Sequence, residues 1–124
     1  MWDGINRRKF PRVKFKCFIF INKKGSSKSI STNTENIGAG GICVIIKDDL
    51  GLFQGVELEI NIEDNHSPIK CSGTVVWVVK KRATGKSGEY LYDTGIEFVD
   101  IDEQQRERII KVVDDVLEKE KSVA

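Results

Sequence analysis

The sequence is poor in the residues that bind metals or form disulfides. It contains three cysteines and one histidine in 124 residues. Cys17, Cys43 and Cys71 are widely spaced among apolar neighbours, and neither a CxxC nor a CxxH pair occurs. This spacing excludes the common zinc motifs, and an odd number of such cysteines favours reduced thiols packed in a core. We therefore expect no metal site.

Long apolar runs and a catalytic constellation are also missing. Runs such as VVWVV at 75–79 are far too short to cross a bilayer, and MWDGINRRKF has no apolar stretch after its charges. We therefore expect a cytoplasmic protein without membrane insertion. For Trp77, an aromatic residue within a strand, packing in the core or at a barrel end is the favoured interpretation, and a position facing a ligand is the alternative. Asp93 and Glu97 have no histidine or lysine partner in the strand pattern that contains them, so the sequence predicts no catalytic residue, no cofactor and no enzyme.

Charge is unevenly distributed, although the formal net charge is only +1. The first 28 residues contain nine lysines and arginines but only one acidic residue, Asp3, whereas the last quarter is mainly acidic. A basic segment in a nearly neutral chain indicates a local anion site rather than general binding to nucleic acid. A solvated basic surface is the alternative.

Apolar residues mostly alternate with polar ones, as in strands that bury one face. The segment VELEINI at 56–62 shows this most clearly. Turn-forming residues separate it from five further predicted strands, at 14–21, 28–35, 42–46, 69–80 and 89–99. Gly73 and Gly95 lie inside the last two, and such glycines indicate the bends or bulges that close a small barrel.

From residue 102 the apolar period becomes helical. Apolar residues within 109–117 recur at i, i+3, i+4, i+7 and i+8, and Asp102 with Gln105 resembles a capping box. The sequence therefore predicts a single domain over 1–124 that is mainly β. A flexible segment at 1–13 precedes a six-stranded antiparallel β-barrel at about 14–99, and an amphipathic α-helix follows at about 102–120.

The basic segment NRRKFPRVKF is rich in arginine. The planar guanidinium of arginine matches a phosphate or the O6/N7 edge of guanine, and it also stacks on bases. Pro11 disfavours a helix here. We therefore expect Arg7, Arg8 and Arg12 on a bent segment that wraps over the barrel mouth.

The glycine-rich stretch NIGAGG at 36–41 precedes the strand-like residues ICVII. It lacks the last glycine of a dinucleotide fingerprint, no GK[ST] follows, and a strand cannot supply the helix N-terminus that holds a pyrophosphate. Glycine permits positive φ or a close approach to another backbone. We interpret this stretch as a turn that faces a ligand.

The two stretches together resemble the PilZ domain. The signature of that family is RxxxR followed by [D/N]xSxxG, and this chain has Arg8-x-x-x-Arg12 followed by Asn36-x-Gly38-x-x-Gly41. The resemblance implies a PilZ-like split barrel. GTVVWV at 73–78 and the segment 93–109 resemble the closing strands and C-terminal helix of the family, so the likeness extends over nearly the whole chain.

PilZ domains are bacterial receptors for the second messenger cyclic di-GMP, and the resemblance implies a role for each matching residue. Arg8 and Arg12 would clamp phosphate and guanine, and Asn36 would hydrogen-bond to a guanine edge. Gly41 would let the backbone turn close beneath the ligand, with Gly40 assisting.

Two positions bear on stoichiometry and affinity. Arg7 suggests stacking on a second nucleotide, because some members of the family bind an intercalated ligand dimer. Gly38 stands where the family most often has serine. One lost neutral hydrogen bond is worth about 1 kcal/mol, whereas a charge-assisted arginine contact is worth about 1.5–3 kcal/mol. We therefore expect binding that is weakened but retained.

The sequence thus predicts a stand-alone cyclic di-GMP receptor that signals to an unidentified partner protein through ordering of its N-terminal segment. An alternative, motivated by Gly38, is a PilZ-like protein–protein interaction domain with weak or lost nucleotide binding. A barrel that binds single-stranded nucleic acid is disfavoured, because the basic residues cluster at one end and the strand aromatics are expected to be internal.

Overall fold

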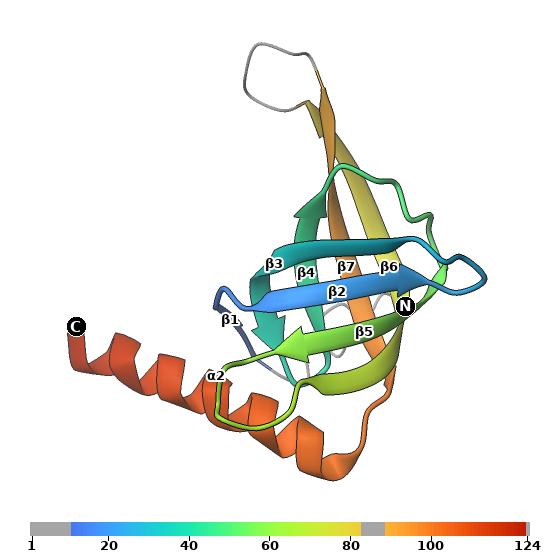
Figure 1. Ribbon diagram of the computed structural model, residues 1–124. Coiled ribbons are helices and arrows are strands. Elements are labelled where there is room, and N and C mark those ends of the chain that lie inside the picture. Colours follow the sequence, from blue (N-terminus) through green and yellow to red (C-terminus); the bar gives the residue numbers. More distant parts are fainter. Residues whose placement is uncertain (1–10, 83–88, 124) are drawn as a thin grey trace, which may run out of the picture.

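The computed structural model describes residues 11–82 and 89–123. Within these residues the chain forms seven strands and one helix (Figure 1). In chain order they are β1 (Arg12–Lys14), β2 (Phe18–Lys23), β3 (Ser29–Gly38), β4 (Gly41–Ile46), β5 (Gly55–Asn61), β6 (Ile69–Arg82), β7 (Tyr90–Asp100) and α2 (Glu103–Val123).

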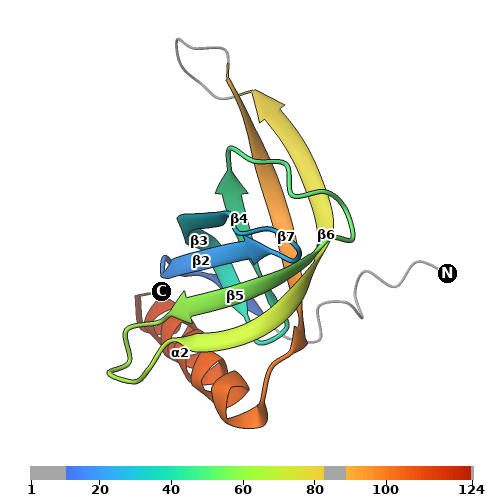
Figure 2. The same cartoon turned by 45° about the vertical axis from the view of Figure 1, so that its right-hand side comes forward.

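Six of the strands close into an antiparallel barrel. Their order is β3-β2-β5-β6-β7-β4, and β4 pairs back with β3 to complete the ring. The short strand β1 adds to β3 on the same edge as β2. Beyond the barrel, β6 and β7 continue together as a two-stranded ribbon (Figures 1 and 2). The predicted six-stranded barrel with a C-terminal helix is confirmed.

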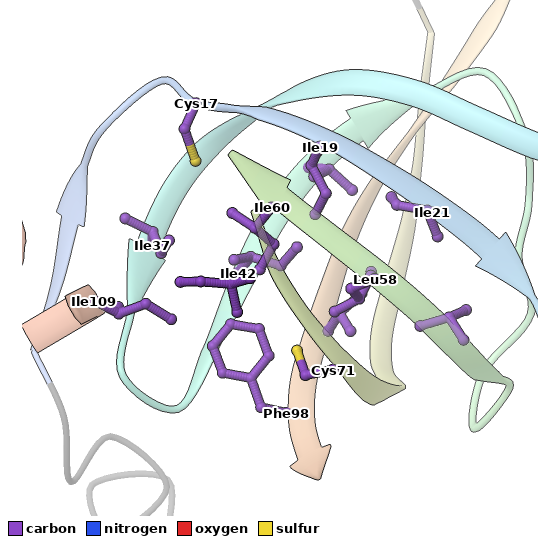
Figure 3. Close-up of a cluster of buried hydrophobic side chains, with 14 of the residues drawn as sticks. Cys17, Ile19, Ile21, Ile37, Ile42, Leu58, Ile60, Cys71, Phe98 and Ile109 are labelled. Carbon is purple, nitrogen blue, oxygen red and sulfur yellow. The ribbon is translucent and has the colours of Figure 1, made fainter. Parts of the chain in front are cut away.

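The barrel interior is filled by branched aliphatic side chains from every strand (Figure 3). Ile19 and Ile21 of β2 are fully buried, as are Ile37 of β3 and Ile42 of β4. Alternation of inward and outward side chains along each strand produces this core, and each buried aliphatic side chain contributes about 1.5–3 kcal/mol of transfer free energy.

Helix α2 covers one end of the barrel beside β1 and β3. Its apolar stripe inserts Ile109, which is fully buried, and the carboxylate of Asp102 accepts a hydrogen bond from the Gln105 amide at 2.9 Å, as a capping residue should. Arg108 donates two hydrogen bonds to Asp64, at 2.7 and 2.8 Å, and so ties the helix to the β5–β6 loop. These bonds hold the pKa of Asp64 below its usual range. In the described part of the chain, no helix is long and apolar enough to cross a membrane.

The segment predicted as one strand at 14–21 is two strands in the structure. The chain leaves β3 after Lys14 and rejoins it at Phe18, with one residue more on this side than on β3. The buried hydroxyl of Thr34 fills the gap: it donates to the Phe15 carbonyl at 2.7 Å and accepts from the Cys17 amide at 3.1 Å. Alternation alone could not reveal this break, because a side chain from another strand satisfies the backbone there.

Thr34→Val tests this junction. Valine keeps the shape but removes the partner of the buried Cys17 amide and of the partly buried Phe15 carbonyl, so we expect a loss of about 1–3 kcal/mol in the free energy of unfolding. The measurement is urea denaturation. Thr94→Val is the matched control, because Thr94 is equally buried but, among the described residues, its hydroxyl makes a single bond, of 3.2 Å, to the nearby Tyr92 carbonyl. Equal losses in the two variants would contradict the role of Thr34.

Candidate functional site

The predicted site residues that the structure describes lie together on the outer face of the barrel. Arg12 in β1 pairs with Gly38 in β3, and Asn36 pairs with Lys14 on one side and Cys43 of β4 on the other. The intervening Ile37 points into the core (Figure 3), so its neighbours in β3 face outward. Arg12 therefore lies in a paired strand, within the segment expected to be flexible.

Two of the predicted residues cannot be placed. Arg7 and Arg8 lie outside the described residues. Gly40 and Gly41, in contrast, are placed with the group: Gly38 pairs with Gly41 across a two-residue turn, Ala39–Gly40, which joins β3 to β4. The Gly40 carbonyl accepts a hydrogen bond from the Phe98 amide at 2.9 Å, which holds this turn against β7.

The glycines of the turn permit close approach of neighbouring strands. Neither Gly38 nor Gly41 has a positive φ. A Cβ at Gly41 would collide with the Ile96 carbonyl of β7, and a Cβ at Gly38 would lie 2.6 Å from the Pro11 carbonyl. The space that a serine side chain would need at position 38 is therefore occupied by the backbone that leads into β1.

Trp77 of β6 supports Arg12 on this face. The guanidinium carbon of Arg12 lies 5.3 Å from the centroid of the indole ring, within cation–π range. The indole lies over Gly95 of β7, where any Cβ would collide with it, and β6 has a register irregularity between Val75 and Trp77. The glycine inside β7 thus makes room for a half-buried indole on the outer face. Sequence reasoning assigned Trp77 to packing, and Gly95 was the one signal for its position.

Asp93 of β7 also belongs to this group, through its hydrogen bonds. Its carboxylate accepts a hydrogen bond from the Cys43 thiol at 2.9 Å and pairs with the Lys81 ammonium at 3.1 Å. Burial alone would raise the pKa of Asp93, but hydrogen bonds from Cys43, Lys81 and Trp77 outweigh it and lower the pKa. Burial, with the bond to Asp93, raises the pKa of Cys43 to about 12. Cys43 is therefore a neutral hydrogen-bond donor at physiological pH and not a nucleophile.

Asn36 presents an unsatisfied acceptor at the centre of this face. Its side-chain Oδ1 is buried, and no residue in the described part of the chain donates a hydrogen bond to it. A buried polar atom without a partner costs about 1–3 kcal/mol, so such atoms are rare in folded proteins. A cation over an aromatic ring, together with a buried acceptor that lacks a donor, suits a planar anionic ligand with N–H donors once that acceptor is uncovered. Among residues 11–82 and 89–123, no group of three or more His, Cys, Asp or Glu side chains could hold a metal ion.

The fold and this face define a small closed β-barrel with an apolar interior and with the polar groups of Arg12, Asn36 and Asp93 together on its outer surface. The family model of the PilZ domain matches residues 6–115. The chain belongs to the PilZ domain family.

Solved structures with the same fold span several bacterial proteins. The inhibitor of motility MotI/DgrA from Bacillus subtilis has a TM-score of 0.70 and 22% identity, over 90% of this chain and 52% of that one. The complex of MrkH from K. pneumonia with c-di-GMP has a TM-score of 0.75 and 15% identity, over 94% and 55%. The chain thus spans about half the length of MotI and MrkH.

The PilZ domain of YcgR from Escherichia coli, solved with c-di-GMP, matches this chain at nearly full length. Its TM-score is 0.70 at 9% identity, with 94% of this chain and 95% of that chain covered. At such identities the likeness concerns the fold. Comparison with curated protein sequences gives no match.

Substitution of the two paired glycines by alanine should have separable effects. Gly38→Ala pushes on Pro11 and so should loosen β1 locally, because among the described strands β1 pairs with β3 alone. We expect faster amide hydrogen exchange in residues 12–14 with little change in the melting temperature. Gly41→Ala forces apart the β4–β7 pair that closes the barrel, and overpacking of this kind costs about 1–3 kcal/mol of global stability. A global loss in Gly38→Ala as large as in Gly41→Ala would contradict this assignment.

Proposed function

We propose that this domain binds cyclic di-GMP on the outer face formed by β1, β3, β4 and β6. The observation that carries the proposal is the Arg12 guanidinium stacked on Trp77 beside the unpartnered, buried Oδ1 of Asn36. Membership of the PilZ family supports it, as do structures of MrkH and of the YcgR PilZ domain with c-di-GMP.

Each group on this face has a chemical counterpart in the ligand. In the described part of the chain, the Oδ1 of Asn36 has no hydrogen-bond donor as a partner, and the Watson–Crick edge of guanine carries two suitable donor groups, N1–H and N2–H₂. The Arg12 guanidinium matches a phosphate or the O6/N7 edge, and the ring beneath it limits the side-chain entropy lost on binding. Arg8 and Arg7, by family analogy, would supply the second clamp and a stacking surface.

Binding at this face would reach the rest of the molecule through β1. This strand joins the barrel by only three residue pairs with β3, and α2 packs against it. Pro11, Ala39 and Val113 line a small cavity of about 130 Å³ between the N-terminal segment, the β3–β4 turn and the helix. A ligand held by Arg12 would stabilise β1 and order the residues before it, and an unidentified partner protein would recognise the altered surface.

Gly38 favours a second candidate function, a protein interaction domain without nucleotide binding. Loss of the serine hydroxyl at this position would by itself leave an empty space beside the turn. Instead, the Pro11 carbonyl and Arg12 Cγ lie 2.6 and 3.0 Å from the position of a Cβ there. A ligand that needs contact with this part of the turn must first displace the start of β1. The cost of that displacement decides between the two candidates.

Calorimetric titration with cyclic di-GMP, with GTP and cyclic di-AMP as controls, tests the proposed function. We expect selective binding by the wild type. Arg12→Ala should weaken it by about 10- to 100-fold, because a charge-assisted contact is worth about 1.5–3 kcal/mol. Arg12→Lys should recover only part of the affinity, since lysine keeps the charge but not the planar fork.

Lys28→Ala is the matched control for loss of one positive charge. Lys28 pairs with Asp48 at 3.1 Å, away from the β1–β3–β4 face, and its removal should leave the affinity unchanged. Affinity that is unaffected by Arg12→Ala would refute the site. A folded wild-type protein that gives no heat with cyclic di-GMP would support the interaction domain instead.

A further inference from the structure

A second outer face of the barrel carries two exposed phenylalanines. Phe18 and Phe20 of β2 are 41% and 39% exposed, whereas Ile19 and Ile21 between and after them are fully buried. The two rings are 4.9 Å apart at an interplanar angle of 86°, an edge-to-face pair. Both face solvent on a strand whose neighbours are β3 and β5, so this face differs from the one that carries Arg12 and Trp77 (Figure 1).

The polar residues that flank the pair do not cover it. Phe18 is opposite Asn33 and Asn61 in the neighbouring strands, and Phe20 is opposite Ser31 and Glu59. Single exposed apolar residues are ordinary on protein surfaces. A rigid aromatic pair in the middle of a sheet is different, because aromatic anchors held on a preformed surface dominate the energy of protein interfaces.

A negatively charged groove lies beside this pair. It has a volume of about 730 Å³, begins at Phe20, and runs across β5 and β6 to the end of β7. Four carboxylates and one ammonium group line it, from Glu57, Glu59, Asp100, Asp102 and Lys70.

Within the described residues, the carboxylates that line the groove form at most weak ion pairs, so their negative charge is not neutralised by neighbouring cations. Glu57 pairs with Lys24 at 3.5 Å and Glu59 with Lys70 at 4.0 Å, and all four side chains are at least 40% exposed. Exposed pairs of this kind are weak and exchange partners readily. No ion pair of Asp100 occurs within residues 11–82 and 89–123, and the described residues provide no cluster that would hold a metal ion here.

We propose that this face docks a basic segment of a partner protein that carries an apolar anchor. The anchor packs on the rings of Phe18 and Phe20, and the lysines or arginines that flank it lie along the carboxylates of the groove. The sign of the groove disfavours nucleic acid and anionic membranes, which would be repelled. The proposal concerns a surface other than the nucleotide face, and it stands whether or not the domain binds cyclic di-GMP.

NMR titration of the ¹⁵N-labelled protein tests the proposal. The probe is a synthetic peptide that alternates lysine with leucine, and its counterpart has glutamate in place of lysine. We expect saturable shifts for the lysine peptide, centred on the amides of 18–22, 57–59 and 70–72, and none for the glutamate peptide. Shifts that map elsewhere, equal response to both peptides, or no saturable binding would overturn the proposal.

Substitutions separate the apolar and electrostatic parts. Phe20→Thr should lower the affinity for the lysine peptide by about tenfold or more, as is typical when a hot-spot aromatic residue is removed. Tyr90→Thr is the matched control, because Tyr90 is 43% exposed in β7 and does not line this groove, and it should change nothing. The pair Glu57→Lys and Glu59→Lys should reverse the preference toward the glutamate peptide. Equal affinity of Phe20→Thr and the wild type would refute the anchor.

Two further measurements exclude other occupants. Analytical sedimentation tests whether a second copy of this chain occupies the face. A dimer that dissociates in the Phe20→Thr variant would identify the second copy as the occupant and would overturn the proposal. Peptide titration of the Arg12→Ala variant should match the wild type, so failure of nucleotide binding and failure of this face are distinguished.

Discussion

The hydroxyl of Thr34 allows β3 to pair with three neighbouring strands, β1, β2 and β4. β3 pairs with β4 along one edge, while its other edge is shared between β1 and β2. Two separate strands can use one edge only if the chain bulges between them, and a bulge leaves backbone groups unpaired in the core. Thr34 supplies a donor to one of these groups and an acceptor to another. Without that junction, β1 would not lie beside Gly38, and Arg12 would not reach Trp77.

Close packing against glycine residues shapes the outer face of the barrel. At Gly38, Gly41 and Gly95, the place of a side chain is taken by a group from another part of the chain: the Pro11 carbonyl before β1, the Ile96 carbonyl of β7 and the Trp77 indole of β6. Bare backbone at Gly95 lets the indole lie close against the barrel, and the Arg12 guanidinium lies over that ring. A half-buried cation makes stronger electrostatic contacts with an anion than a fully exposed one, because less water competes for it.

The fold could be predicted well because its signals are local. Alternation predicted the strands, the change of period at residue 102 predicted the helix, and Asp102 caps it as expected. What alternation could not predict is any feature made by two distant segments. The break at Phe15–Cys17 depends on Thr34, and the outward position of Trp77 depends on Gly95 and a bulge in β6.

The motifs name the residues of the candidate site, but local patterns do not describe the contacts that distant segments make there. RxxxR and NxGxxG identify residues by motif, and the structure brings Arg12, Asn36, Gly38, Gly40 and Gly41 to one face. The motif does not say what occupies the place of the family's serine. A hydrogen-bond count treats Gly38 as a simple loss, whereas the structure fills that space with the strand that carries Arg12.

The two outer faces share β3, and this gives the domain a mechanical path between them. Residues 36–38 of β3 belong to the face proposed to bind the nucleotide, and residues 29–33 pair with β2, which carries the exposed phenylalanines. The junction at Thr34 lies between these two parts. A ligand that displaces or stabilises β1 therefore acts on the one set of hydrogen bonds that also positions the start of β2. Because a packed barrel core resists continuous deformation, coupling between the faces requires such discrete connections. Besides this junction, they are α2, which contacts β1 and β3, and the strands β6 and β7, which contribute residues to both faces.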